Sequence, residues 1–328
     1  MIWIVLFVSL LATLIPTIFY ARILGWFDRF ENTYSHLGLG AFLWGVLPAV
    51  ILVLVSDLIL RIPLRALDIT TDEMMNVGLM APLTEEPSKA LILLIFFFKL
   101  GREHDDPIVW IIYGGLAGFG FALTENIFYF LDAAYLGGVG LWMYVVFMRS
   151  FFFGLNHALF TSLTGLGLGL ARVRAPFFAR VLFAGAGLGA AMLFHALHNL
   201  GMIQAQTFPS AFRMSVLTDW AGVAGVGILM LLIKREENMR ALKELREELE
   251  NGVIDANDYA LATSLRTRLT TRVLALVSRR AKTRIGWLAP RLADLAFAKY
   301  QYRKGRDYAR AIQALRMEIL GIRTALNH

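Results

Sequence analysis

Long apolar segments alternate with short polar connections over the first 233 residues of the chain. A helix crosses the hydrocarbon core of a bilayer with about 20 predominantly apolar residues. By this measure the pattern predicts an all-α fold, a polytopic bundle of seven transmembrane helices. One of the seven is too long for a single crossing, so we expect it to tilt or to begin with an interfacial part. The predicted spans are approximately residues 2–20, 39–60, 78–99, 108–131, 143–171 (the long one), 179–205 and 216–233.

The last 95 residues follow a different pattern, in which charged and apolar positions recur at helical spacing. The chain is therefore expected to consist of a membrane-embedded core at 1–233 and a small helical appendage at 234–328. The elements expected in this tail are a charged helix over 234–250 ended by Asn251-Gly252, an amphipathic helix over 255–284, and two further helices, one beginning at Pro290 and one following Gly305.

Composition supports a membrane protein. Hydrophobic residues make up 57% of the chain and the mean hydropathy is +0.59, which leaves too little polar surface for a soluble domain of this size. The tail carries 20 Lys and Arg against 11 Asp and Glu, and it supplies the formal net charge of +7. Beside membrane spans, such a basic segment is expected to face the lipid bilayer, and no nucleic acid partner is expected. The chain has no cysteine, which excludes disulfides, thiolate metal ligands and a cysteine nucleophile.

Basic residues gather in the connections after the first, third, fifth and seventh predicted spans. The positive-inside rule therefore predicts a multi-pass plasma-membrane protein with its N-terminus outside and its tail in the cytoplasm. No basic residue precedes the first span and no small-residue cleavage site follows it. The first span is thus expected to be a retained helix rather than a signal peptide.

The third predicted span contains Glu85, Glu86 and Lys89 within an otherwise apolar helix. Each ionisable group inside a bilayer costs several kcal/mol unless it is paired or hydrated, so such groups are candidates for function. Lys89 follows Glu85 by four residues and Glu86 by three, which allows its side chain to reach either carboxylate. Such a site can keep one carboxylate available as a base while the other is held by hydrogen bonds.

Three further spans also carry polar groups. In the predicted topology, those of the fourth and sixth spans lie about 9–15 Å below the outer surface, level with Glu85. His157 joins this layer if its span begins near residue 150. Unrelated polar residues would not be expected to line up in this way, so we expect one polar site shared by four helices. The groups are Glu125 and Asn126 in the fourth span, His157 in the fifth, and His195, His198 and Asn199 in the sixth.

Small residues spaced four apart allow two helices to approach closely in a membrane. The fourth, fifth and sixth spans each carry such a pair, which predicts that these helices pack tightly against one another. The pairs are Gly114 and Gly118, Gly165 and Gly169, and Gly185 and Gly189.

These motifs resemble the PrsW family of membrane-embedded proteases, and more distantly the CAAX prenyl protease and bacteriocin-immunity-related families. The PrsW pattern is Glu-Glu-x-x-Lys, then Phe-x-x-x-Glu, then later histidine motifs. In this chain the corresponding residues occur in the same order on separate spans, within roughly residues 20–205. They are Glu85, Glu86 and Lys89, then Phe121 and Glu125, then His157 and His195. The CAAX-type relatives have histidine where this chain has Glu125, and the tail has no expected counterpart in the family.

The resemblance implies proteolysis in or at the membrane, with a single-pass membrane regulator such as an anti-sigma factor as the substrate class. In the implied mechanism Glu85 is the general base for a water molecule, Glu86 assists it, and His195 and Asn199 stabilise the oxyanion or bind the water. Two versions remain open. In one, Glu125, His157 and His195 bind zinc with an open fourth position. In the other, glutamate activates the water without a metal.

Other interpretations of the same residues also remain open. Buried carboxylates and histidines form proton relays in ion-coupled transporters, although no internal repeat typical of transporters is found. The polar residues can instead form a structural ion pair and interhelical hydrogen bonds in a scaffold or sensor that acts through its tail. No His-Glu-x-x-His, Gly-x-Gly-Asp or Gly-x-Ser-x-Gly motif is present to indicate another protease class.

Overall fold

The computed structural model describes residues 2–27, 36–66, 72–100, 106–174, 176–305 and 307–327. These residues form helices joined by turns, and no strand occurs among them, which confirms the all-α class. They divide into two compact units that meet in the sequence between Ile228 and Leu229. The predicted division after residue 233 falls within the same helix.

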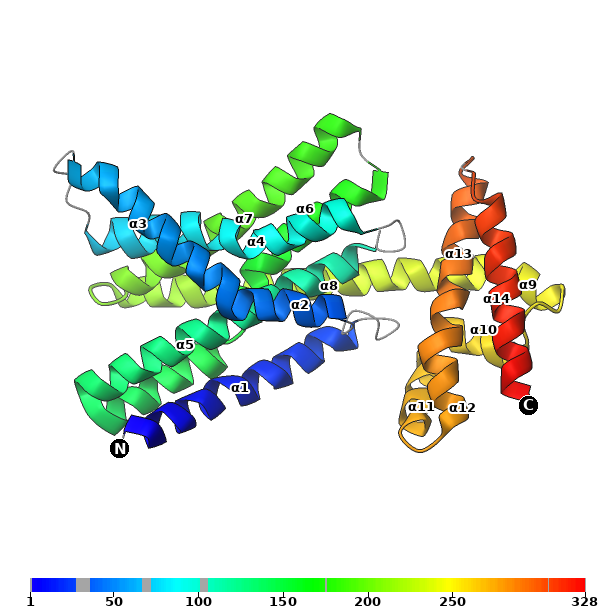
Figure 1. The fold of residues 1–328 in the computed structure, drawn as a ribbon, viewed down its shortest axis with the longest axis horizontal. Helices are drawn as coiled ribbons and strands as arrows, with labels where there is room; N and C mark the ends of the chain where they lie inside the picture. The colour runs from blue at the N-terminus through cyan, green and yellow to red at the C-terminus, as the bar shows by residue number, and fades with distance from the viewer. Residues whose placement is uncertain are drawn as a thin grey trace. The chain divides into compact units, whose positions relative to one another are not determined.

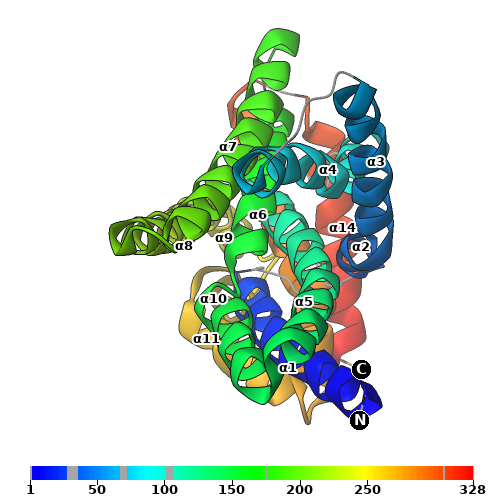
Figure 2. The same ribbon diagram turned by 90° about the vertical axis from the view of Figure 1, so that its left-hand side faces the viewer.

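The first unit is a bundle of long helices. Its elements are α1 (Ile2–Trp26), α2 (His36–Trp44), the π-helical turn η2 (Gly45–Ala49), α3 (Val50–Ala66), the π-helical turn η3 (Met74–Met80), α4 (Ala81–Lys99), α5 (Pro107–Val146), η5 (Phe147–Phe152), α6 (Asn156–Arg174), α7 (Phe177–Gln204) and α8 (Pro209–Glu244), which continues into the second unit. α6 packs against both α5 and α7, and α4 contacts all three of these helices (Figure 1, Figure 2).

The chain is an integral membrane protein. Five helical stretches in the described residues are long and apolar enough to cross a membrane, and they overlap six of the seven predicted spans, all but 78–99. The predicted number of seven is not confirmed by this measure. Two differences account for it: α4 has three charged residues near its middle, and the fourth and fifth predicted spans belong to one continuous apolar stretch, Pro107–Arg172.

The chain turns back on itself at Gly138, within the residues of α5. Gly138 has φ 61° and ψ −156°, a backbone conformation that glycine adopts without a steric penalty. After it, Arg149 contacts Glu125, which lies 24 residues earlier. A straight helix would separate these two residues by about 36 Å. The predicted fifth span is then interrupted again, because Phe153–Leu155 are not helical, so it does not form one straight crossing.

Glycines allow α6 to pack directly against the backbones of its neighbours. A Cβ atom on Gly114 would overlap the backbone carbonyl of Thr161, and one on Gly165 would overlap that of Trp110. This confirms the predicted close packing of the fourth and fifth spans. The predicted pair Gly185 and Gly189 is wrong: no atom of another element lies within 4 Å of a Cβ placed at either position. Instead, α7 approaches α6 through Gly187, which lies against Gly167.

The second unit is a small helical domain with its own hydrophobic core. Its elements after α8 are α9 (Arg246–Glu250), α10 (Ala256–Thr263), α11 (Leu265–Ala275), α12 (Arg279–Thr283), the π-helical turn η6 (Arg284–Leu288), α13 (Ala289–Arg303) and α14 (Ala309–Asn327). Gly252 has a positive φ of 73° directly after α9, as expected for a helix C-cap. The helices predicted near Pro290 and after Gly305 are also present.

The single amphipathic helix predicted over 255–284 is wrong. The structure has three shorter helices there, α10, α11 and α12. Ser264 and Ser278 have extended backbones at the two breaks, and their hydroxyl groups accept N-cap hydrogen bonds from Thr267 and Ala281. Because serine at an N-cap stabilises a helix start by about 1 kcal/mol, each break begins a new helix that the apolar pattern alone does not reveal.

A buried ion cluster joins the helices of the second unit. The side chain of Glu248 in α9 is fully buried and accepts hydrogen bonds from Lys299 of α13 and Arg316 of α14. Lys299 also binds Glu247. A buried carboxylate is tolerated only when its charge is paired and its oxygens are hydrogen-bonded, so this cluster fixes α9 against the last two helices.

We expect Gly165→Ala to destabilise the first unit, because the new methyl group would overlap the Trp110 carbonyl and force α5 and α6 apart. Overpacking of this kind costs about 1–3 kcal/mol. The measurement is the melting temperature of the detergent-solubilised protein. The matched control is Gly185→Ala, which faces open space on α7 and should melt at or above the temperature of the unmodified chain. Equal melting of the two variants would contradict the close approach of α5 and α6.

Candidate active site

Three neighbouring residues of α4 form the centre of the polar site. The Lys89 ammonium donates hydrogen bonds to Glu85 Oε2 at 3.0 Å and to Glu86 Oε1 at 2.8 Å. The side chains of Lys89 and Glu86 are fully buried, and that of Glu85 is 9% exposed. Because all three charges are removed from water, their mutual pairing is what makes this stretch of α4 tolerable inside an apolar bundle.

The two carboxylates have different surroundings. Glu86 accepts hydrogen bonds from Lys89 and from Thr161 of α6, and it lies 2.9 Å from His195 Nδ1 of α7. Among the described residues, Glu85 accepts one hydrogen bond, from Lys89, and it lies 3.9 Å from His195 Nε2. Glu86 is therefore held by three helices, whereas Glu85 keeps unused acceptor capacity.

His157 of α6 connects this centre to Glu125 of α5. The Lys89 ammonium lies 3.1 Å from His157 Nδ1, and His157 Nε2 lies 2.8 Å from Glu125 Oε2. An ammonium group is only a donor, so Nδ1 must accept the hydrogen bond from Lys89. Nε2 must then carry a hydrogen and donate it in a hydrogen bond to Glu125. His157 is thus assigned as the neutral Nε2–H tautomer, with the lone pair of Nδ1 directed at the centre of the site.

Phe121 forms one wall of the site. The Lys89 ammonium lies 4.0 Å from the centre of the Phe121 ring, and the ring of His157 lies 5.6 Å from it. A cation over an aromatic face is stabilised electrostatically, more strongly when it is desolvated. The phenylalanine of the Phe-x-x-x-Glu motif therefore contacts the lysine of the Glu-Glu-x-x-Lys motif.

Arg149 was not anticipated from the sequence and is the principal partner of Glu125. It contacts the Glu125 carboxylate, donates to Asn126 Oδ1 at 2.8 Å, and lies 3.8 Å from the centre of the Tyr129 ring. The sequence did contain one indication of its importance: Arg149 is the one Asp, Glu, Lys or Arg residue between Asp132 and Arg172. Asn126 therefore serves to orient Arg149.

His198 and Asn199 point to other partners. His198 Nδ1 lies 2.7 Å from the carboxylate of Asp219 in α8, which also accepts a hydrogen bond from Asn156. Asn199 donates to the backbone carbonyl of Val77. Asp219 was missed, although it is a single carboxylate within the seventh predicted span. These contacts form a second polar cluster beside the first, and they fix α7 to α6, α8 and η3.

A metal ion fits the central group by the chemistry of its donors. Glu85, Glu86, His157 and His195 each place one potential ligand atom within 4.8 Å of those of the other three. Carboxylate oxygens and imidazole nitrogens are zinc ligands. Three of the four residues already surround a positive charge, the Lys89 ammonium. Glu125, which the sequence analysis included among the zinc ligands, is not one of these four. Its carboxylate contacts Nε2 of His157, the ring nitrogen that points away from Lys89.

The sequence was compared with known families, curated proteins and solved structures. Residues 35–233 match the family model described as PrsW family intramembrane metalloprotease. This range contains all of the residues described in this site. No curated protein and no solved structure matches the chain.

We expect Lys89→Met to lower the melting temperature strongly, because it leaves two adjacent buried carboxylates without their shared cation. Breaking a buried ion pair costs about 3–5 kcal/mol. The double variant Lys89→Met/Glu85→Gln should recover part of this loss, since one of the two unpaired charges is removed. Lys99→Met, an exposed position at the end of the same helix, is the control. If Lys89→Met melts like Lys99→Met, the ammonium does not hold the site together.

Proposed function

Since the chain belongs to the PrsW family of intramembrane metalloproteases, we propose that it cleaves a membrane-anchored regulatory protein by means of a water molecule activated by Glu85. The observation that carries the proposal is the unequal environment of two adjacent carboxylates. Glu86 is engaged by Lys89, Thr161 and His195, while Glu85 accepts one hydrogen bond within the described part of the chain and is the more accessible of the two. Membership of a peptidase family weighs against the transporter and scaffold alternatives.

In the proposed reaction, Glu85 accepts a proton from water as the water oxygen forms a bond to the carbonyl carbon of the scissile peptide. The resulting oxyanion is stabilised by the Lys89 ammonium, while His195 Nε2, which lies near Glu85, accepts a hydrogen bond from the attacking water. Glu85 then returns the proton to the amide nitrogen as the carbon–nitrogen bond breaks. Such a base typically contributes about 10²–10⁴ to the rate.

Glu86, Glu125 and Arg149 are positioning residues in this proposal. Glu86 orients His195 by accepting from its Nδ1–H, which leaves Nε2 with a lone pair. Glu125 orients His157 in the same manner from the opposite side, and Arg149 holds Glu125. Asn199 donates a hydrogen bond to the Val77 carbonyl, so no role in stabilising the oxyanion is assigned to it.

The central group would hold a zinc ion through the carboxylate of Glu86 and the imidazoles of His157 and His195, which leaves Glu85 as the base and the fourth coordination position open. When bound, the ion supplies Lewis acidity and lowers the pKa of water. Carboxylates that accept from the second nitrogen of a ligating histidine fix its orientation and tautomer, and Glu125 has this relation to His157. This arrangement supports an orienting role for Glu125 in place of the ligand role expected from the sequence.

The proposed substrate is a single-pass membrane protein such as an anti-sigma-factor-like regulator. The site lies within helices that lipid surrounds, so a substrate bond must arrive at the bundle while anchored in the same bilayer. The proposed topology has the N-terminus outside and the tail in the cytoplasm, as the distribution of basic residues indicates.

The experiment that tests the function is co-expression of the chain with a panel of tagged single-pass membrane proteins, followed by immunoblotting for fragments. Fragments are expected with the unmodified chain and are expected to fall at least about 100-fold with Glu85→Gln, which keeps shape and polarity but cannot act as a base. Glu73→Gln, an exposed position before α4, is the control and should cleave normally. Fragments of equal yield from both variants would refute a catalytic Glu85.

Metal binding is tested by the zinc content of the purified protein, measured by mass spectrometry after dialysis against trace zinc. We expect about one zinc per chain, and a loss of most of it in His157→Ala and His195→Ala, because each removes a nitrogen ligand. His198→Ala is the matched control, since that ring contacts Asp219, and it should retain zinc. Zinc contents that do not differ among the three variants would favour the metal-free version of the reaction.

A further inference from the structure

The second unit has an exposed apolar turn that its own fold leaves uncovered. Val273, Leu274, Leu276 and Val277 lie at the end of α11 and in the turn before α12, and all four are exposed. Leu276 and Val277 are 84% and 88% exposed, respectively. Four large aliphatic side chains among five consecutive residues at a protruding turn are costly in water, so the turn is expected to have a partner.

The sequence around this turn carries basic residues and no acidic ones. Between Asp258 and Asp294 the sequence contains eight Lys and Arg residues and no Asp or Glu. Arg279, Arg280 and Lys282 of α12, directly after the turn, are exposed. A partner that covers the apolar turn must therefore also carry negative charge, which a second copy of this basic segment would not supply.

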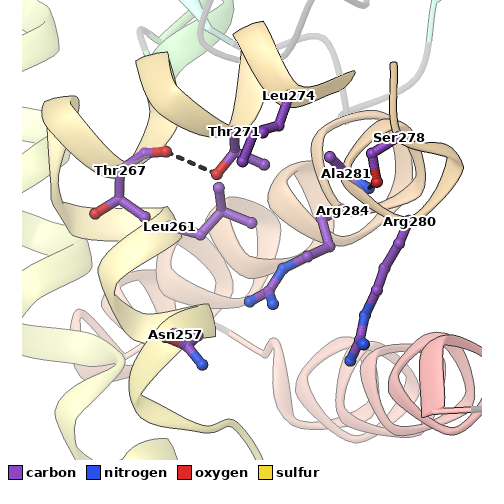
Figure 3. A pocket seen from close by; sticks show the side chains of 9 residues that line it. All are labelled: Asn257, Leu261, Thr267, Thr271, Leu274, Ser278, Arg280, Ala281 and Arg284. Carbon is purple, nitrogen blue, oxygen red and sulfur yellow. Dashed lines mark hydrogen bonds between the residues drawn. The ribbon is translucent and has the colours of Figure 1, made fainter. Parts of the chain in front are cut away.

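A shallow pocket beside the turn offers groups that suit a phosphate. It has a volume of about 260 Å³ and lies between α10, α11 and α12. Leu274 belongs to both the turn and the pocket, while Arg280, Arg284 and Ser278 provide its charged and hydroxyl groups. In Figure 3 the side chains of Arg280 and Arg284 extend to the same side of the pocket. Arg284 also binds Asp258, which anchors it in place.

We propose that the α11–α12 turn docks on the surface of a bilayer that contains anionic lipids. The four aliphatic side chains enter the region between headgroups and acyl chains, and the cations of α12 lie among the lipid phosphates. Apolar side chains combined with basic residues are what binds proteins to anionic membrane surfaces. α8 runs without a break from a candidate membrane span into this unit, so the unit is covalently tethered to a helix that can cross a bilayer.

The absence of native cysteine allows a clean test on the full chain. Val277→Cys is labelled with a polarity-sensitive fluorophore, and one chain is reconstituted per nanodisc, either in phosphatidylcholine or with added phosphatidylglycerol. We expect a blue shift and quenching by doxyl-labelled lipids in the anionic discs, both reversed by high salt because charge attraction is screened. Met317→Cys, an exposed position on α14, is the matched label control and should respond to neither lipid.

Neutralising the cations of α12 distinguishes docking on anionic lipid from burial of the fluorophore by another part of the protein. Because each basic residue near an anionic surface contributes roughly 1 kcal/mol, the triple variant Arg279→Gln/Arg280→Gln/Lys282→Gln should lower the ratio of docked to free turn on the order of 100-fold. Inorganic phosphate at matched ionic strength should leave the lipid quenching unchanged. A blue shift that doxyl lipids do not quench would show that protein covers the turn, and a shift that is equal in neutral and anionic discs would show that charge has no part in docking; either result would overturn the proposal.

Discussion

The buried ammonium of Lys89 is the interaction on which the first unit depends. It lies within hydrogen-bonding distance of two carboxylates of its own helix and one imidazole of α6, and through Glu86 it is linked to α7. None of these groups can be left alone in an apolar bundle without a large loss, because breaking a buried ion pair costs about 3–5 kcal/mol, a large share of the stability of a typical protein. The requirement to pair them therefore determines which faces of α4, α6 and α7 meet.

That pairing is possible only because the helices approach closely. Glycines at the contact between α5 and α6 bring the backbone at Trp110 to Gly165 and the backbone at His157 to Gly118. His157 is thus carried on a backbone that is in direct contact with α5, the helix of Glu125. The geometry of the site therefore depends on the packing of α5 against α6. A larger residue at these glycines would displace α6 and with it His157, a candidate zinc ligand.

The polar residues that the sequence singled out meet in the structure, with different partners from those expected. Glu85, Glu86, Lys89, His157 and His195 form one group, and Glu125 adjoins it through His157. His198 and Asn199 instead contact Asp219 and Val77. Helical spacing predicts which residues share a face of one helix. It does not predict the rotation of each helix relative to its neighbours, which is set by packing. For the same reason Arg149 and Asp219 were not recognised as partners.

The sequence by itself determined the all-α class of the protein, its membrane character and most of the polar residues that gather at the candidate site, because bilayer length and the cost of buried charge act locally along the chain. It also anticipated the glycine-mediated contact of α5 and α6, but placed the glycine of α7 two residues from its true position. Only the tertiary structure decided the reversal at Gly138, the division of the tail at Ser264 and Ser278, and the unequal surroundings of Glu85 and Glu86. These depend on contacts between residues far apart in the chain or on the competition between a cap and a continuing helix, which no periodic pattern records.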